Sequence, residues 1–436
     1  MKRVKYFSII AAVTMLLTSC AGSNKESKKS DTLNVIFASS PQPHEREYVT
    51  NKFIKKFEEE NGVKVNVDFV AQSDAVKKIK TEQDSKKIVT DVLLVDTANM
   101  SPYIDGNWME DIKDVVKESG NTYTDMFDDS TDRDGKKYFV PNTFDIYLLA
   151  ANKEALKYLP EGIKEEDVVK GIKWEDYTKW AINIKNGEKI GKTMLPTSMT
   201  DSQLLYPIGG LGLSYGAKFP DFNSDEFKEA IKNISEIAAV DGFYPEQNQY
   251  TAPTDPLKSE NVWLTFAHMS TIGSAYQASP NKFVIGAAPS GTKGAGSTAG
   301  AWCFGIQKDA PNKDLAKKFL LYSMKPEVNY DYAVGFGGAL SPIKEVNDIL
   351  DADDVIMKAG ANMLDKTIIS GVPATEYKDW NAVKLLYGDL YNEIDNKKSI
   401  PSDEFLNDLQ KKLDDLKKWL KGSIYSLLNY RRFYEK

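Results

Sequence analysis

The chain has 436 residues, of which 42% are hydrophobic and 27% are charged, and its net charge is −7. This length allows two or three domains with substantial cores, and the composition is that of a folded globular protein rather than a disordered one. The negative charge argues against a nucleic-acid-binding protein, which would carry a basic surface.

The N-terminus has the pattern of a secretory signal. Three basic residues among the first five precede an apolar run over 6–17, which is shorter than the about 20 residues that span a bilayer. The sequence Leu17-Thr18-Ser19-Cys20 resembles the bacterial lipobox, in which the chain is cut before a Cys that carries lipid. We therefore predict a signal peptide over 1–19, a lipidated Cys20 and a polar tether over 20–32. The alternative is an ordinary signal peptide with a chance Cys.

Cysteine and histidine are scarce. The two Cys residues are Cys20 and Cys303, so a lipidated Cys20 leaves no partner for a disulfide, and Cys303 is predicted to be a buried apolar residue. The chain has only two His residues, which weakens the case for a metal site or a His-dependent catalytic site. We expect no metal and no cofactor.

The first third of the chain alternates between strand and helix patterns. Apolar strands are predicted over 33–37 and 92–95, and an alternating strand over 63–69. Helices are predicted between them, one ending at Gly62 and one over 73–87. This order predicts an α/β fold with a parallel sheet.

Polar residues follow two of these strands. Ser39, Ser40 and Gln42 come after the first strand, and Asp96 and Asn99 come after the third. Because open α/β sheets bind ligands at the carboxyl ends of their strands, we expect these side chains to line a ligand site. Caps on the following helices are the alternative role for such residues.

The rest of the chain repeats the mixture of strands and helices. We predict strands over 140–151, 262–266, 282–286 and 302–306, helices over 174–185, 224–240 and 313–324, and a Gly/Ser/Thr-rich connector over 291–300. From about 376 the chain is predicted to be helical, with one apolar face made by Leu406, Leu409, Leu413, Leu416 and Leu420. The basic, aromatic segment 424–434 is predicted to pack as a helix end, with membrane contact as the alternative.

The acidic segment 128–135 resembles a calcium-binding loop. If Gly135 takes the sixth position of such a loop, the first and twelfth positions fall on Ser130 and Pro141, where an EF-hand needs acidic residues. We therefore predict a solvated turn here.

Six segments resemble family 1 extracellular solute-binding proteins, the receptors of ATP-binding-cassette (ABC) importers. They include Asp134-Gly-Lys-Lys-Tyr-Phe-Val-Pro141, Gly300-Ala-Trp-Cys-Phe-Gly-Ile306 and Ala310-Pro-Asn-Lys-Asp-Leu-Ala-Lys-Lys-Phe-Leu320, and all six occur in family order. The other three are 53–65, 91–96 and 152–156, and in the second of these Thr90 stands where the family has Pro.

The resemblance implies a two-lobe, periplasmic-binding-protein-like α/β fold of type II. Each lobe would be a mixed sheet flanked by helices, with the ligand cleft between the lobes. By correspondence the chain crosses between lobes near 142–146, 296–301 and 337–341. One lobe is then 33–144 plus 301–338, and the other is 145–300 plus 339–436.

The resemblance also implies a function and further site residues. It implies a lipid-anchored, monomeric, non-enzymatic receptor outside the cytoplasm that captures a mono- or oligosaccharide and passes it to an ABC permease. Trp302 would stack on the sugar and Asp145 would accept its hydroxyl groups, so Asp145→Asn should weaken binding with little loss of fold stability. His268, Met269 and Tyr276 are further candidates near the cleft. The alternatives are a polyamine, an iron complex or a peptide as ligand, or a surface glycan hydrolase.

Overall fold

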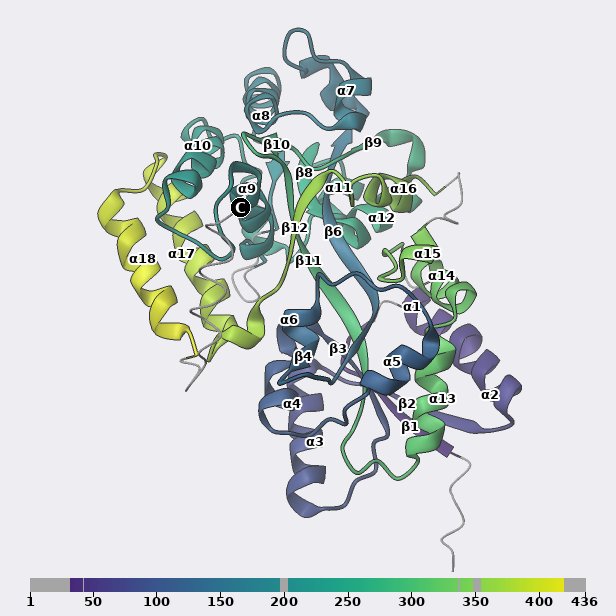
Figure 1. The fold of residues 1–436 in the computed structure, drawn as a ribbon. Coiled ribbons are helices and arrows are strands. Elements are labelled where there is room, and N and C mark those ends of the chain that lie inside the picture. Colours follow the sequence, from purple (N-terminus) through teal and green to yellow (C-terminus); the bar gives the residue numbers. More distant parts are fainter. Residues whose placement is uncertain (1–31, 42, 197–202, 336–337, 348–353, 419–436) are drawn as a thin grey trace, which may run out of the picture.

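The computed structural model describes residues 32–41, 43–196, 203–335, 338–347 and 354–418. Figure 1 shows two lobes joined by the long strands β6 (Val140–Asn152) and β11 (Gly294–Ile306). The predicted signal peptide, Cys20, Gln42, Leu420 and the C-terminal basic segment lie outside the described residues. No helix in the described ranges is long and apolar enough to cross a membrane.

The first lobe, at the bottom of Figure 1, contains the predicted parallel sheet. Strands β1 (Thr32–Phe37), β2 (Lys64–Phe69) and β3 (Val92–Asp96) pair in the order β2-β1-β3, which confirms the three predicted strands. The predicted end of α2 at Gly62 is also confirmed, because Gly62 adopts the left-handed conformation with φ of 64°. The helices of this lobe are α1 (Pro43–Tyr48), η1 (Val49–Ile54), α2 (Lys55–Asn61), α3 (Gln72–Ser85), α4 (Ser101–Asp105), α5 (Lys113–Ser119), α6 (Asp128–Thr131), α13 (Lys313–Ser323) and α14 (Pro326–Gly335).

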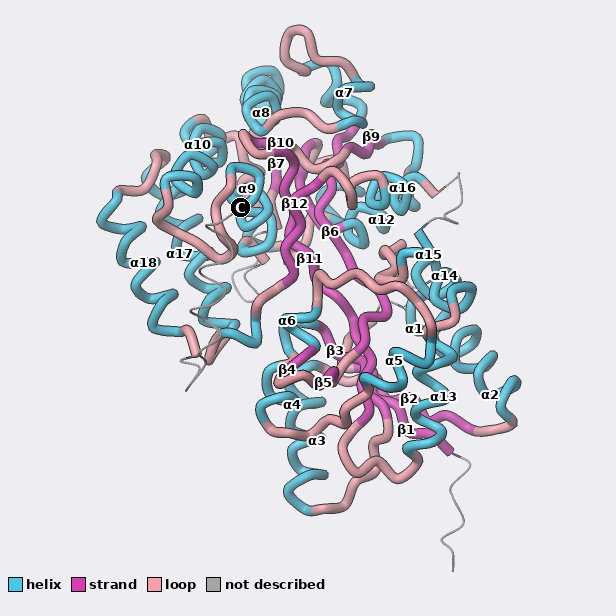
Figure 2. The backbone as a smooth tube through the Cα atoms, viewed as in Figure 1, coloured by secondary structure: helices cyan, strands magenta, loops and turns pink. Residues whose placement is uncertain are grey.

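The second lobe is a mixed sheet covered by helices on its outer sides, as Figure 2 shows. Its strands, besides parts of β6 and β11, are β7 (Thr193–Met194), β8 (Leu264–His268), β9 (Phe283–Gly286), β10 (Ser290–Gly291) and β12 (Thr367–Gly371). Its helices are α7 (Glu165–Lys170), α8 (Trp174–Glu188), α9 (Leu205–Tyr215), α10 (Asp225–Ala239), α11 (Thr254–Lys258), α12 (Met269–Ala278), α16 (Val355–Ala361), α17 (Trp380–Lys397) and α18 (Asp403–Leu416).

The two long strands change partners at the junction of the lobes. Strand β6 pairs with β11 up to Asp145 and with β8 from Tyr147 onward. Strand β11 pairs with β12 up to Ala299 and with β3 from Trp302 onward. One continuous sheet therefore links the lobes, and Asp145 and Trp302 lie where it passes from one lobe to the other.

The segment 291–300 is not the predicted connector. Most of it belongs to β11, and the unpredicted helix α9 packs directly on it. A Cβ atom at Gly296 would lie 2.3 Å from the carbonyl oxygen of Gly210, so only glycine allows this close approach of the two backbones. The small residues that suggested a loop are small because a helix covers them.

Residues just after the predicted third crossing at 337–341 still contact the first lobe. Ile343 forms an antiparallel bridge with Tyr123 of the first lobe, and the Thr124 N–H donates to the Pro342 carbonyl at 3.0 Å. Helix α15 (Lys344–Asn347) follows, and α16 packs against β6 and α12 of the second lobe. The residues just before α15 therefore contact the first lobe, and α16 contacts the second.

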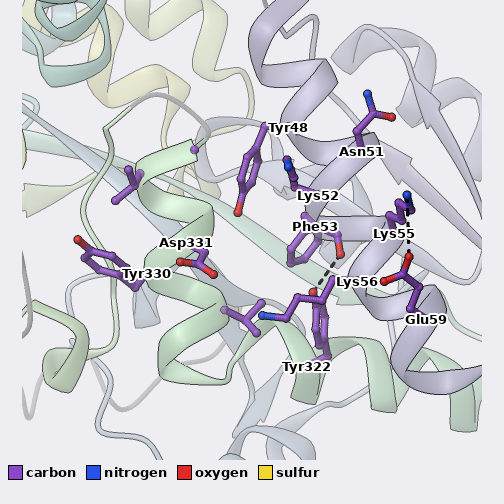
Figure 3. A pocket seen from close by; sticks show the side chains of 13 residues that line it. Tyr48, Asn51, Lys52, Phe53, Lys55, Lys56, Glu59, Tyr322, Tyr330 and Asp331 are labelled. Atoms are coloured by element: carbon purple, nitrogen blue, oxygen red, sulfur yellow. Dashed lines mark hydrogen bonds and ion pairs between the residues drawn. The ribbon is translucent and has the colours of Figure 1, made fainter.

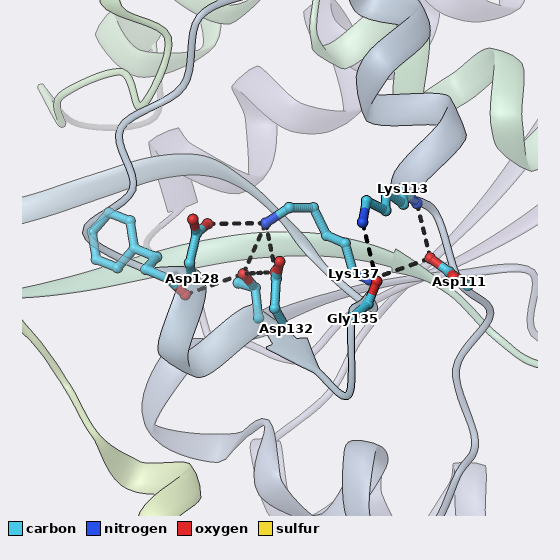
Figure 4. A network of polar contacts seen from close by, with 8 residues as sticks. Asp111, Lys113, Asp128, Asp132, Gly135 and Lys137 are labelled. Atoms are coloured by element: carbon cyan, nitrogen blue, oxygen red, sulfur yellow. Dashed lines mark hydrogen bonds and ion pairs between the residues drawn. The ribbon is translucent and has the colours of Figure 1, made fainter. Parts of the chain in front are cut away.

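The first half of the acidic segment 128–135 forms helix α6, and the predicted solvated turn is confined to Asp134 and Gly135. Figure 4 shows the short hairpin of β4 (Asp132–Arg133) and β5 (Lys136–Lys137) next to α6. The Lys137 ammonium lies 3.1 Å from Asp128 Oδ1 and 2.6 Å from Asp132 Oδ1. These carboxylates are therefore paired with a side-chain cation. In the described part of the chain, no three His, Cys, Asp or Glu residues are grouped so that they could hold a metal ion.

The apolar interior agrees with the predicted patterns. Leu406, Leu409 and Leu413 of α18 are buried, as the spacing of 3 and 4 indicates. Cys303 is fully buried in β11, which confirms its predicted role as an apolar core residue, and burial raises the pKa of its thiol. Its neighbour Trp302 is only partly buried, because it faces the junction of the lobes.

Candidate functional site

Two adjoining hollows lie at the junction of the lobes, and we call them together the cleft. The wider one has a volume of about 870 Å³ and lies between α3, the end of β3 and α4 of the first lobe and α9, β8 and the start of α17 of the second. The narrower one has a volume of about 560 Å³ and lies between the ends of β1 and the middle of β6 and β11. Gln72 lines both hollows. Volumes of this size suit small-molecule ligands.

The cleft brings together most of the residues predicted to form the site. Trp302, Asp145, Ser39 and Ser40 line the narrower hollow, and Asp96, Asn99 and His268 line the wider one. Two predicted residues lie elsewhere. The side chain of Met269 is fully buried, and Tyr276 packs against the core on α12 without lining either hollow. Both are on α12, the helix that follows β8; of its first turn Ser270 lines the narrower hollow, whereas the Met269 side chain points into the core.

The register of β11 fixes the position of Trp302. It lies opposite Thr143 of β6 on one side and Asp96 of β3 on the other. Its ring is partly buried against the core of the first lobe, and its remaining surface lines the narrower hollow. A flat apolar surface held in this way is suited to stacking on an apolar ligand face.

Asp145 is held by the start of α12. Its Oδ1 accepts the Met269 N–H at 2.8 Å, and its Oδ2 accepts the Ser270 N–H at 3.1 Å and the Ser270 hydroxyl at 2.6 Å. A carboxylate has about four acceptor positions, so three are used and one is open. Asp145 therefore caps a helix and lines the cleft, whereas only the second role was expected.

Burial sets the protonation of the two titratable groups in the wider hollow. It raises the pKa of Asp96, against the opposing effects of the Ala98 N–H, the Lys384 ammonium and the Asn99 amide. It lowers the pKa of His268, although Asp145 Oδ2, 3.6 Å from His268 Nδ1, favours the charged form. The His268 ring packs 4.3 Å from the Tyr147 ring between centroids. His268 is therefore a neutral, partly aromatic wall of the hollow at neutral pH.

Several polar atoms around the cleft are buried and have no hydrogen-bond partner among the described residues. They are Ser39 Oγ, Gln72 Oε1, Thr143 Oγ1 and Trp380 Nε1. All four residues line one or both hollows. A buried polar group without a partner costs about 1–3 kcal/mol, and four of the sixteen such atoms in the described residues belong to residues that line the cleft.

The sequence missed several residues of the cleft. Gln72, Thr143, Tyr206, Trp380 and Lys384 line it but were not predicted. Tyr206 is on α9, whose Pro and three Gly residues argue against a helix in the sequence. Trp380 is the first residue of α17, within the region predicted to be helical from about 376, and its position beside the cleft depends on how that region packs.

A third hollow of about 600 Å³ lies apart from the cleft, on the first lobe alone. Figure 3 shows its walls, which come from η1 and α2 on one side and α13 and α14 on the other. Its polar groups are partly paired, since the Tyr322 hydroxyl donates to the Phe53 carbonyl at 3.0 Å and Lys55 lies 3.9 Å from Glu59. Neither β6 nor β11 contributes to it, so it is separate from the junction of the lobes.

Comparison with known proteins places this fold in context. The family model described as bacterial extracellular solute-binding protein matches residues 52–363. A solute-binding protein of an ABC transporter from Thermotoga lettingae, bound with α-D-tagatose, is similar with a TM-score of 0.71 and 19% identity, over 88% of this chain and 99% of that one. The maltotriose-binding protein of Thermus thermophilus, bound with maltotriose, is similar with a TM-score of 0.68 and 15% identity, over 88% of this chain and 99% of that one.

A third structure shares the same arrangement. The cyclic α-maltosyl-1,6-maltose-binding protein of Arthrobacter globiformis gives a TM-score of 0.71 at 14% identity, over 88% of this chain and 98% of that one. At identities this low, the likeness establishes the two-lobe fold and leaves the ligand to be argued from the cleft itself.

Proposed function

Because this chain belongs to the bacterial extracellular solute-binding proteins, we propose that its cleft captures a mono- or oligosaccharide for delivery to an ABC importer. The observation that carries this proposal is the set of four unpartnered buried polar atoms around a cleft that also contains the Trp302 ring. A sugar could satisfy both features of the cleft. Its hydroxyl groups can donate to and accept from the polar atoms, and its apolar C–H faces can stack on the Trp302 ring.

The similar structures support this choice of ligand. Those from Thermotoga lettingae and Thermus thermophilus contain tagatose and maltotriose. The family and these structures are binding proteins, and we propose that this chain is likewise a receptor and not a glycan hydrolase. The cleft carboxylates Asp96 and Asp145 favour this, because both are engaged with backbone N–H groups: Asp96 accepts that of Ala98, and Asp145 accepts those of Met269 and Ser270 at the start of α12.

We propose that the two lobes close on the ligand and that the closed shape is recognised by the permease. The lobes are proposed as 33–144 plus 301–347 and 145–300 plus 354–418, because Ile343 bridges to Tyr123 of the first lobe and α16 packs against the second. We propose a monomeric receptor, since each chain contributes both walls of its own cleft.

A thermal-shift screen against sugars tests the proposed function. A ligand at 100 times its dissociation constant adds about 2.7 kcal/mol, which for a chain of this length raises the melting temperature by roughly 3 °C. We expect at least one mono- or oligosaccharide to do so. A shift produced by spermidine or by a ferric complex, with none from any sugar, would replace the proposal with one of these other ligands.

We also propose that Cys20 carries a lipid that anchors the receptor to the cell membrane, as its lipobox-like surroundings suggest. Cys20→Ser removes the thiol that would be acylated, so we expect the variant protein to be released from membranes or to remain unprocessed. Fractionation of cells followed by immunoblotting measures this, with Cys303→Ser as the matched control. Normally processed Cys20→Ser protein that stays in the membrane fraction would place the anchor elsewhere.

A further inference from the structure

We propose that the segment 371–376, which we call the strap, stabilises the conformation in which the two lobes enclose the sugar. The strap connects β12 to α17, which both belong to the second lobe, and its last three residues form the short turn η6 (Ala374–Glu376). This inference rests on the proposed function and deepens it, because it names the contacts that hold the binding conformation and therefore regulate the affinity.

The strap follows a strand of the second lobe and rests on the first lobe. Figure 1 shows the chain descending from β12 beside α6 before it enters α17. The turn η6 contacts α6 and also η2 (Thr97–Asn99), the turn that follows β3. Val372 of the strap lines the wider hollow of the cleft. The strap is therefore a part of the wall of the cleft where the two lobes meet.

Two buried hydroxyl groups hold the strap across the boundary between the lobes. The Ser130 hydroxyl of α6 donates to the Val372 carbonyl at 2.8 Å. In the opposite direction, the Thr375 hydroxyl of the strap donates to the Asp129 carbonyl at 3.0 Å. Ser130 and Thr375 are only 2% and 5% exposed, so separating the lobes here would break hydrogen bonds that are shielded from water.

Two further contacts lie at the edge of this interface. The Ser101 hydroxyl at the start of α4 donates to the Ala374 carbonyl at 3.2 Å. Lys418, whose N–H donates to the Glu376 carbonyl at 2.8 Å, lies with its ammonium 2.5 Å from Asp105 Oδ2 of the first lobe. The Lys418 and Asp105 side chains are partly exposed, so this ion pair contributes less than the buried hydroxyl groups do.

The strap also approaches the first lobe too closely for a side chain at its first residue. A Cβ atom at Gly371 would lie 2.5 Å from the Met126 carbonyl oxygen and 3.5 Å from the Phe127 ring. Gly371 pairs with Ala299, the last residue of β11 that pairs with β12. An added methyl group at Gly371 would therefore push the strap away from the first lobe without removing a hydrogen-bonding group.

The position of the strap determines how it acts on binding. Both of its ends are attached to the second lobe, so its contacts with the first lobe are lost when the lobes separate. These contacts stabilise only the enclosed conformation, and the apparent affinity for a ligand of that conformation depends on its population. Loss of a strap contact should therefore weaken the binding of different sugars by one common factor. Loss of a side chain that contacts the sugar would instead weaken them unequally.

Titration calorimetry and small-angle X-ray scattering on the mature chain test the inference. We expect Thr375→Val and Ser130→Ala each to weaken binding by about threefold to tenfold, and by the same factor for two chemically different sugars from the screen. Gly371→Ala should weaken binding in the same uniform way. Without sugar, the double variant of Thr375 and Ser130 should have a larger radius of gyration than the wild type.

Two matched controls come from the neighbouring strand. Thr367→Val changes a threonine of β12 whose hydroxyl has no partner among the described residues, and Ser370→Ala removes a hydroxyl that donates to the Gly371 carbonyl within the second lobe. Both controls should keep the wild-type affinity and radius of gyration.

The outcomes distinguish the strap from the proposed function. Unchanged affinity in Thr375→Val and Ser130→Ala would mean that the strap moves with the first lobe, and it overturns the inference while the proposed function stands. A loss that differs between the two sugars overturns it as well. If no sugar binds, the proposed function fails, and the radius of gyration without sugar decides the inference: an unchanged radius in the double variant overturns it.

Discussion

Replacing Trp302 with alanine is expected to weaken binding of the sugar by about 2 kcal/mol or more, roughly thirtyfold in the dissociation constant. The ring lines the narrower hollow at the junction of the lobes, where it is held by β3 and β6 on either side of β11. Its loss would remove a large, partly exposed apolar surface of that hollow that can stack on a sugar face. Titration calorimetry with the best sugar from the screen gives the change.

Two controls separate binding from folding in this experiment. Trp302→Phe keeps a flat ring, so it should retain most of the affinity. Trp108→Ala removes another partly buried Trp of the first lobe that lines neither hollow, so it should affect the melting temperature and not the affinity. Wild-type affinity in Trp302→Ala would remove Trp302 from the binding site.

Asp145→Asn is expected to lower both the affinity and the stability. Asn keeps the shape of Asp but loses the charge that holds the Met269 and Ser270 N–H groups at the start of α12. The lost cap should reduce the free energy of unfolding by about 1–2 kcal/mol, and loss of the charged acceptor should weaken sugar binding by about tenfold. Chemical denaturation and calorimetry measure the two effects.

This expectation differs from the one that the sequence supports, in which Asp145→Asn leaves stability almost unchanged. Ser270→Ala is the matched control, because it removes only the hydroxyl contact to Asp145 Oδ2 and keeps both backbone contacts. It should lower stability less than Asp145→Asn does. Unchanged stability in Asp145→Asn would mean that the carboxylate contributes little to the helix start.

Local patterns in the sequence were sufficient for most of the fold. The strands β1, β2 and β3 and the end of α2 at Gly62 follow from periodicity and from a glycine at a left-handed position. The same applies to the buried face of α18. These features depend on residues close together in the chain, which is why a single sequence reveals them.

The errors arose where tertiary packing decides the structure. Helix α9 was not predicted, and the start of β11 was predicted as a connector, because each is rich in small residues that allow the other to approach. The bridge between Tyr123 and Ile343, which are more than two hundred residues apart in sequence, was likewise not predicted. No local sequence pattern predicts a contact between residues so far apart in the chain.

The site was predicted in part for the same reason. Strand ends and family correspondence led to Asp96, Trp302 and Asp145, which all line the cleft. The unpartnered atoms of Gln72 and Trp380 are visible only once the lobes are assembled, because burial from both sides leaves them without partners. The cap that Asp145 provides is likewise a contact between residues far apart in sequence.

The central claim is that a sugar binds between the lobes, against Trp302 and the unpartnered polar atoms of the cleft. A crystal structure of the mature chain with the sugar that gives the largest melting shift tests this most directly. We expect the sugar in the cleft, with its ring against Trp302 and hydrogen bonds to at least two of Ser39, Gln72, Thr143 and Trp380. A sugar bound instead in the outer hollow between α2 and α14, with the cleft empty, would contradict it.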